Sequence, residues 1–407
     1  SSAQTITWQR SYHGLGPAGF ETIYSIVETA DSGYIAVGNT RPGGGAGSYM
    51  MAMKINRYGD SLWFRYYESS PSAVKIIQTF DGNYVMAGVH GDLIKINDQG
   101  EIIWTSLRGN SSIRAGSILE TSRKELLLTG SIGTRSYCFL MMVDSLGIHQ
   151  WERTYTDYEF GGFTDVIEIN GQFTLCGYDI EKIVRLLLIR INRTGEIISE
   201  HRYSKYQSTP TSLELANDDR IVLAGTGEPE LNPGNSAFLM KIDTAGNVMW
   251  RKTFNPGNPE FGFCSEMISL GQKGYALFGS ASYDSINILN SAGQLILADL
   301  DGNQIMQRKY RLSESNLVAH FILRTSDNGL ISGGGRDEPF SYHIIKSDIS
   351  GSTTKIRENG FIAHSEEFKV LPSFPNPFNS ATKIRFYNNQ SQVMKIEIFD
   401  ITGKLLE

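Results

Sequence analysis

The chain contains little of what most metal, redox or nucleic-acid chemistry requires. Only three of its 407 residues are cysteine, and Cys138, Cys176 and Cys264 lie in separate apolar stretches without any Cys-x-x-Cys pair. We therefore expect buried free thiols and neither a zinc cluster nor a disulfide framework. No apolar run approaches the ~18 residues of a membrane-spanning helix. The net charge of −6 argues against a nucleic-acid-binding surface.

Catalytic motifs are also missing. The seven histidines are dispersed without His-Glu-x-x-His or His-x-His spacing, so we expect no metal site. There is no Gly-x-Ser-x-Gly elbow, no phosphate-binding Gly-x-x-x-x-Gly-Lys-Ser/Thr loop and no Gly-x-Gly-x-x-Gly motif opening a helix. These absences lower the odds of an enzyme but do not exclude one, because catalytic groups can converge from distant parts of a chain.

Glycine and tryptophan are the informative residues, because they repeat in register. Four of the five tryptophans lie four residues after a glycine, and the same frame continues to seven glycines: Gly59, Gly100, Gly147, Gly195, Gly246, Gly302 and Gly351. Three residues before each of them stands an Asn or Asp: Asn56, Asn97, Asp144, Asn192, Asp243, Asp299 and Asp348. This spacing predicts seven hairpin turns, in which the Asx side chain bonds the turn backbone and glycine accepts a positive φ.

A second set of glycines follows short apolar segments: Gly38, Gly88, Gly130, Gly177, Gly225, Gly279 and Gly334. We interpret each as the end of a strand such as Tyr-Ile-Ala-Val-Gly (34–38), preceded by a turn and another strand. Each unit then holds four antiparallel strands, which we call a, b, c and d. Seven such units predict an all-β fold, a seven-bladed β-propeller over residues 5–358.

The recurrent tryptophans Trp8, Trp63, Trp104, Trp151 and Trp250 are predicted to pack between neighbouring blades, with each indole N–H bound to a local acceptor. The pattern resembles the tryptophan-docking repeat of pyrroloquinoline-quinone dehydrogenases, as in Asp243-x-x-Gly246-x-x-x-Trp250. Adjacent cysteines over a cofactor are missing here, so only the packing carries over and no cofactor is expected. Residues 5–12 match strand d alone, which predicts that the N-terminus closes the ring against the last blade.

Length variation is concentrated in the b–c connections. Because successive strands are antiparallel, the b–c and d–a connections share one rim, and loops on such a rim commonly carry binding sites. The longest b–c connections, 39–48, 226–236 and 280–293, together with 335–341, place blades 5, 6, 7 and 1 in one arc. The candidate binding residues on this arc are Arg41, Glu228, Glu230, Glu260, Phe261, Tyr283, Asp284, Arg336, Asp337 and Glu338.

The C-terminal region has a different pattern. After a polar linker, 359–370, the sequence contains Pro375-Asn-Pro-Phe378 and Ile398-Phe-Asp-Ile-Thr-Gly403. Residues 371–407 resemble the first part of the C-terminal sorting domain of proteins exported by the type IX secretion system of Bacteroidota and their relatives. The resemblance implies the start of a small Ig-like β-sandwich, recognition by the secretion machinery, and delivery to the outside or to the outer-membrane surface.

Two further features fit export. Residues 1–4, Ser-Ser-Ala-Gln, look like the end of a signal peptide, although a trimmed terminus explains them equally simply. If the organism belongs to that group, its O-glycan acceptors resemble Asp-Ser/Thr-aliphatic triplets. Four triplets fit, with the acceptors Ser61, Ser145, Thr244 and Ser285.

Three hypotheses for the function follow. The first is a secreted or cell-surface, non-catalytic propeller that binds an extracellular glycan or protein through its b–c loop face. The second is a secreted polysaccharide hydrolase or lyase with its site at the channel mouth, and the third is a structural subunit of a surface assembly. Carboxylates with perturbed pKa values in the channel favour the enzyme, whereas exposed aromatic groups on the rim favour binding.

Overall fold

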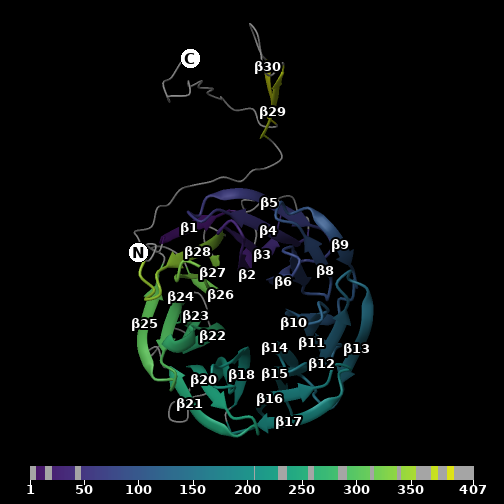
Figure 1. Ribbon diagram of the computed structural model, residues 1–407, viewed down its shortest axis with the longest axis vertical. Coiled ribbons are helices and arrows are strands. Elements are labelled where there is room, and N and C mark those ends of the chain that lie inside the picture. Colours follow the sequence, from purple (N-terminus) through teal and green to yellow (C-terminus); the bar gives the residue numbers. More distant parts are fainter. Residues whose placement is uncertain are drawn as a thin grey trace. The chain divides into compact units, whose positions relative to one another are not determined.

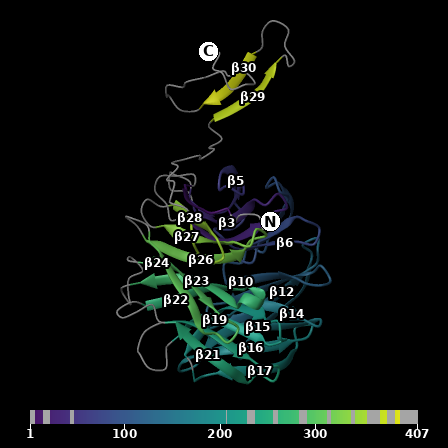
Figure 2. The same ribbon diagram turned by 60° about the vertical axis from the view of Figure 1, so that its left-hand side comes forward.

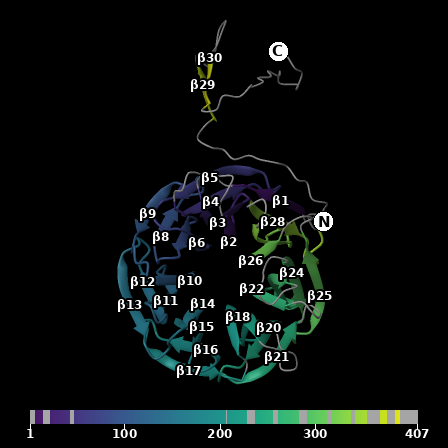
Figure 3. The same cartoon turned by 180° about the vertical axis from the view of Figure 1, so that it is seen from behind.

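The computed structural model shows seven four-stranded antiparallel sheets arranged as blades around a central channel (Figure 1). It describes residues 6–13, 21–41, 47–205, 207–227, 236–254, 261–282, 291–311, 316–336, 341–353, 368–374 and 383–388. Strand a of each blade lies nearest the channel and strand d lies at the outer circumference of the ring, and the view from behind shows the same order (Figure 3). The predicted seven-bladed propeller is confirmed.

The strands follow the predicted order a, b, c, d within each blade. Blade 1 is β2 (Thr22–Glu28), β3 (Tyr34–Thr40), β4 (Tyr49–Ile55) and β5 (Ser61–Tyr67), and blade 2 is β6 (Ala73–Gln78), β7 (Tyr84–Gly88), β8 (Leu93–Ile96) and β9 (Ile102–Ser106). Blade 3 is β10 (Ile113–Glu120), β11 (Leu126–Ile132), β12 (Tyr137–Val143) and β13 (His149–Tyr155), and blade 4 is β14 (Gly162–Ile169), β15 (Gln172–Ile180), β16 (Val184–Ile191) and β17 (Ile197–Tyr203). Blade 5 is β18 (Ser208–Leu215), β19 (Ile221–Gly227), β20 (Ser236–Ile242) and β21 (Val248–Phe254), and blade 6 is β22 (Phe261–Ser269), β23 (Tyr275–Ser282), β24 (Ser291–Ala298) and β25 (Gln304–Tyr310), with a short 3-10 helix, η1 (Gly271–Lys273), between β22 and β23.

Blade 7 is closed by the N-terminus. Its own strands are β26 (Leu317–Arg324), β27 (Leu330–Arg336) and β28 (Ser341–Ser347), and its fourth strand is β1 (Trp8–Tyr12). β1 pairs antiparallel with β28 in the register Trp8↔Lys346 to Tyr12↔Tyr342. The predicted ring closure is therefore confirmed.

The c–d hairpins form as predicted, because their geometry depends on five consecutive residues. All seven turn glycines have φ between +73° and +87°. In blade 1, Asn56 Oδ1 accepts hydrogen bonds from the backbone N–H groups of Tyr58 and Asp60, both at 2.9 Å. The Asx residue makes the same pair of bonds in the other six turns.

The tryptophans of strand d pack against the turn of the next blade. The Trp63 indole N–H donates to the Asp98 carbonyl at 3.0 Å, and a Cβ on Gly100 would lie 2.9 Å from the Trp63 ring. The indoles of Trp8 and Trp104 donate to the equivalent carbonyls of the following blades. The predicted packing between blades is confirmed for these residues.

A tyrosine four residues later completes this contact, and the sequence reasoning missed it. The Tyr67 hydroxyl donates to the Gly100 carbonyl at 2.8 Å, so indole and phenol hold the same turn. Equivalent bonds join strand d to the next turn glycine elsewhere in the ring: Tyr12 to Gly59, Tyr155 to Gly195, Tyr203 to Gly246 and Tyr310 to Gly351.

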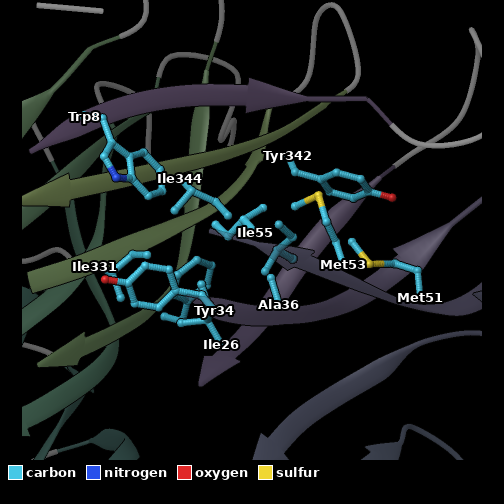
Figure 4. Packing of buried hydrophobic residues seen from close by; sticks show 12 residues of the cluster. Trp8, Ile26, Tyr34, Ala36, Met51, Met53, Ile55, Ile331, Tyr342 and Ile344 are labelled. Carbon is cyan, nitrogen blue, oxygen red and sulfur yellow. The ribbon is translucent and has the colours of Figure 1, made fainter. Parts of the chain in front are cut away.

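The core is divided among the seven interfaces between blades rather than concentrated at one centre. Among the described residues there are seven buried apolar clusters, and each joins two neighbouring blades. Figure 4 shows the cluster at the closure, where Tyr34, Met53 and Ile55 of blade 1 meet Tyr342 and Ile344 of blade 7. The three cysteines are free and buried in such interfaces, as expected, and burial raises the pKa of each thiol, that of Cys264 to about 12.

The C-terminal part forms a separate unit, which begins at Ala363. Its described residues are an antiparallel pair of strands, β29 (Phe368–Phe374) and β30 (Lys383–Asn388), which Figure 2 shows edge to edge. β29 thus begins within the range predicted as a linker, and the 398–403 motif lies outside the described residues. Within the described parts of the chain, no helix is long and apolar enough to span a membrane.

Candidate functional site

Most of the candidate residues on the b–c rim lie outside the described residues: Glu228, Glu230, Glu260, Tyr283, Asp284, Asp337 and Glu338. Arg41 is exposed directly after β3. Phe261 begins β22 and Arg336 ends β27, where it pairs with Ser341, so both backbones lie at the predicted rim. The arrangement of these side chains as one site stays a prediction.

The strand boundaries show how far the b–c connections differ. β3 ends at Thr40 and β4 begins only at Tyr49, and blades 5 and 6 have equally wide gaps, from Gly227 to Ser236 and from Ser282 to Ser291. In blade 7 the gap runs from Arg336 to Ser341, which is as short as in blades 2 and 3. The wide connections of the arc therefore belong to blades 5, 6 and 1.

Every innermost strand contains a β-bulge, and this irregularity shapes the channel. In blade 6 the register between β22 and β23 shifts after Cys264↔Gly279, so Ser265 is the extra residue before Glu266. In each of the other blades, the same shift occurs opposite the glycine that belongs to the second set. A bulge re-aims side chains, and here it turns additional side chains toward the channel.

The bulges also explain six of the seven glycines of the second set; a Cβ on the seventh, Gly88, would instead meet the side chain of Ser70. A Cβ on Gly279 would lie 1.7 Å from the Phe263 carbonyl oxygen, and a Cβ on Gly334 would lie 1.9 Å from that of Val318. These glycines permit the close approach of strand a, and they rarely end strand b as we predicted. Only β7 ends at its glycine, whereas the other six b strands continue beyond it.

The bulges surround a cavity of about 180 Å³ in the channel. Residues of all seven blades line it: Tyr24, Val74, Lys75, Gly116, Ser117, Thr164, Asp165, Thr211, Ser265, Glu266 and His320. The bulges lie near the beginning of each strand a, so the cavity lies toward the rim that carries the b–c and d–a connections. None of these residues was singled out from the sequence.

Residues that follow the bulges join neighbouring blades around the channel. Asp165 Oδ2 accepts a hydrogen bond from the backbone N–H of Leu213 in blade 5 at 3.0 Å. Glu266 Oε2 accepts one from Ile322 in blade 7 at 2.9 Å. Serines make the equivalent bonds elsewhere, from Ile76 to Ser25 and from Met267 to Ser212. These carboxylates therefore also stabilise the ring.

An ion pair spans the channel. The Lys75 ammonium of blade 2 donates to Glu266 of blade 6, and these blades are not neighbours in the ring. The side chains are 30% and 17% exposed, respectively. Burial lowers the pKa of the Lys75 ammonium, but the charges of Glu266 and Asp165 outweigh this effect and raise the pKa, so the ammonium stays protonated.

Glu214 differs from its counterparts in the other blades. Three residues after the bulge, those blades have Val27, Ile77, Leu119, Ile167, Ile268 and Leu323, which are all partly buried. The pKa of Glu214 is raised from 4.5 to about 7, chiefly by burial and also by the charges of Asp165 and Glu266, against the opposing effect of Lys75. Glu214 is thus poised to exchange a proton near neutral pH.

The remaining polar wall of the cavity is neutral. Burial lowers the pKa of His320 to about 4, so its imidazole is uncharged at neutral pH. The ring centroid of His320 lies 4.7 Å from that of Tyr24, with a tilt of 54° between the planes. The described residues contain no group of three or more His, Cys, Asp and Glu arranged to hold a metal ion.

The predicted glycosylation acceptors have different surroundings. Ser145 and Thr244 are exposed in c–d turns, whereas Ser61 is half-buried at the start of β5. Asp60, which precedes Ser61, forms an ion pair with Arg10 at 2.8 Å. Ser285 lies outside the described residues.

The fold and its channel define the chain as a seven-bladed β-propeller, and solved structures of similar shape agree. No protein-family model and no curated protein sequence matches the chain. A catalytically inactive variant of virginiamycin B lyase from Staphylococcus aureus, solved with quinupristin, is 12% identical, with a TM-score of 0.54 over 83% of this chain and 99% of that one. The WD40 domain of Pan2 from Neurospora crassa is 12% identical, with a TM-score of 0.51 over 85% of this chain and 100% of that one.

Raptor from Chaetomium thermophilum is 8% identical, with a TM-score of 0.57 over 88% of this chain and 30% of that one. At these identities the similarity shows the fold alone.

Proposed function

We propose that this chain is a secreted or cell-surface propeller that binds an extracellular glycan or protein partner through its b–c loop face, without catalysis of its own. The difference between its two rims carries this proposal. On the c–d rim there are seven similar Asx–Gly turns. Strand d of the preceding blade donates a tryptophan or tyrosine hydrogen bond to six of them, and the Trp250 ring packs on the seventh, at Gly302. On the other rim the b–c connections differ in length, which leaves them free to vary with a ligand.

The proposed export is supported by the C-terminal motifs and by the cysteines. The Pro375–Phe378 and Ile398–Gly403 segments carry the resemblance to type IX sorting domains, and the antiparallel β29–β30 pair is compatible with the start of an Ig-like sandwich. The ring is closed by strand pairing, so an extracellular protein of this design does not depend on disulfides. Exposed Ser145 and Thr244 are the acceptors we propose for O-glycosylation.

The test is a glycan-array and extracellular-matrix binding screen on the intact protein. In one variant, the b–c connections of blades 5 and 6 are shortened to the length of the one between Ile132 and Tyr137. The control variant, Asp301→Ala, changes the opposite rim only. We expect the loop variant to lose binding and the control to retain it. Equal binding by all three proteins would refute the proposed site.

A second function, a polysaccharide hydrolase or lyase, is favoured by the channel carboxylates. A general acid or base works best with a pKa near the working pH, and Glu214 has this property. The test is whether the wild type degrades a polysaccharide and whether this activity is lost in Glu214→Gln. Loss of activity with retained binding at the rim would show that the protein is an enzyme and not only a binding protein.

A further inference from the structure

The channel cavity has the properties of a built pocket rather than of a gap left by the ring. Each of the seven innermost strands carries a bulge at the same level, and in six blades strand a approaches a glycine of the neighbouring strand so closely that a Cβ there would clash with its backbone. At about 180 Å³ the cavity is smaller than the ~300–1,000 Å³ pockets that hold drug-sized ligands. It therefore suits a small molecule or one terminal unit of a larger molecule.

The hydroxyl groups of the cavity have acceptor capacity left over. Ser265 Oγ donates its proton to the Ala319 carbonyl at 2.6 Å, and Thr211 Oγ1 donates to the Cys264 carbonyl at 3.3 Å. A hydroxyl has one donor and two acceptor lone pairs, so these oxygens can still accept hydrogen bonds from a ligand. Ser117 Oγ likewise donates to Asp165, at 2.9 Å.

His320 supplies both a donor and an acceptor. No hydrogen bond to either of its ring nitrogens is formed by the described residues, and the uncharged imidazole carries one N–H and one bare nitrogen. A ligand group that both donates and accepts, such as a hydroxyl, satisfies either nitrogen.

The charged and aromatic groups of the cavity also suit a ligand with several hydroxyl groups. The carboxylates of Asp165 and Glu266 bind backbone N–H groups of the next blades but retain oxygen lone pairs, and hydrogen bonds to charged acceptors are the stronger ones. The Tyr24 ring adds an apolar wall for the C–H groups of a ligand.

We propose that this cavity binds a small polyhydroxylated molecule of about the size of one monosaccharide unit, held by Thr211, Ser265, His320 and the two carboxylates. This site is separate from the b–c loop face, because none of these residues belongs to a b–c connection. A cation alone uses the carboxylates but leaves His320 and the hydroxyls unpaired, so we expect simple ammonium ions to bind less well.

The test uses saturation-transfer NMR titrations of the full chain with methyl glucoside, methyl mannoside, myo-inositol and, as the cationic probe, choline. We expect saturable binding of at least one polyhydroxylated probe in the millimolar range or tighter and no comparable binding of choline. Thr211→Val removes one hydroxyl without changing the shape, so it should weaken binding about two- to tenfold. His320→Phe should weaken it by about tenfold or more.

Three controls separate this proposal from the others. Thr253→Val makes the same chemical change on the exposed face of β21 and should bind like the wild type. The variant with shortened blade 5 and 6 loops should retain cavity binding even where it loses rim binding, so the two proposals fail independently. Unfolding midpoints verify that each variant is folded. No saturable binding of any polyhydroxylated probe, preferential binding of choline, or unchanged affinity in both cavity variants would overturn the proposal.

Discussion

Replacement of Gly279 by alanine tests whether the b-strand glycines permit the bulges. The added Cβ would lie 1.7 Å from the carbonyl oxygen of Phe263, 2.7 Å from its carbonyl carbon and 2.8 Å from the Cα of Cys264. All three atoms belong to the backbone of β22, so no side-chain rotation relieves the clash. Overpacking costs ~1–3 kcal/mol and occasionally more, so we expect a loss of at least about 3 kcal/mol.

The loss is measurable as a shift in the thermal unfolding midpoint. An unfolding entropy of ~2.1 cal/mol/K per residue gives roughly 0.7 kcal/mol/K for a ring of this size, so a loss of about 3 kcal/mol lowers Tm by about 4 °C. The matched control is Gly47→Ala, whose Cβ would meet nothing within 4 Å, and we expect it to stay within ~0.5 kcal/mol of the wild type. A G279A protein that melts with the control would show that strand a does not need the glycine.

Three further substitutions probe the channel and the interfaces. Burial and the neighbouring carboxylates together raise the pKa of Glu214 from 4.5 to about 7 in the folded protein. The folded state therefore keeps a proton that the unfolded chain loses, and the stability of the wild type falls as the pH rises from 4.5 through 7. In Glu214→Gln the free energy of unfolding should fall by up to about 3 kcal/mol less over this pH range, so the plot of Tm against pH between 5 and 8 becomes flatter. A plot identical to that of the wild type would contradict the raised pKa of Glu214. Lys75→Met leaves Glu266 without its cation and should lower the free energy of unfolding by about 2 kcal/mol. Adding Glu266→Gln should recover part of this loss, which a double-mutant cycle measured by chemical unfolding would show. Trp63→Phe removes the indole N–H bond to Asp98 and should cost about 1 kcal/mol in the same assay, whereas an unaltered midpoint means that this bond adds no net stability.

The c–d turns could be predicted from the sequence because their determinants are local. Asn56 bonds two N–H groups within its own turn, and Gly59 needs only its own backbone freedom. Seven repetitions of this unit then fixed the number of blades. The hydrogen bond from the tyrosine to the next turn could also have been predicted, because Tyr67 stands four residues after Trp63 in the repeat.

The channel could not be predicted in the same way, because its determinants are distant in sequence. Gly279 belongs to a repeat that is visible in the sequence, but the reason for glycine at this position is a carbonyl group on another strand, which would clash with a Cβ. Lys75 and Glu266 are 191 positions apart, and nothing local to either residue indicates that they meet. Glu214 offered one usable signal: it is the acidic residue at a position that is aliphatic in the other six blades.

The pairing of β1 with β28 also has a consequence for folding. Ser11 and His343 are 332 positions apart, and joining chain segments so distant costs roughly 5 kcal/mol in loop-closure entropy. The apolar face of blade 1 shown in Figure 4 stays uncovered until residues such as Tyr342 and Ile344 are available. One face of the first blade to be synthesised is therefore covered only when the last blade is made, and a nascent chain stalled before blade 7 exposes this face to chaperones or to aggregation.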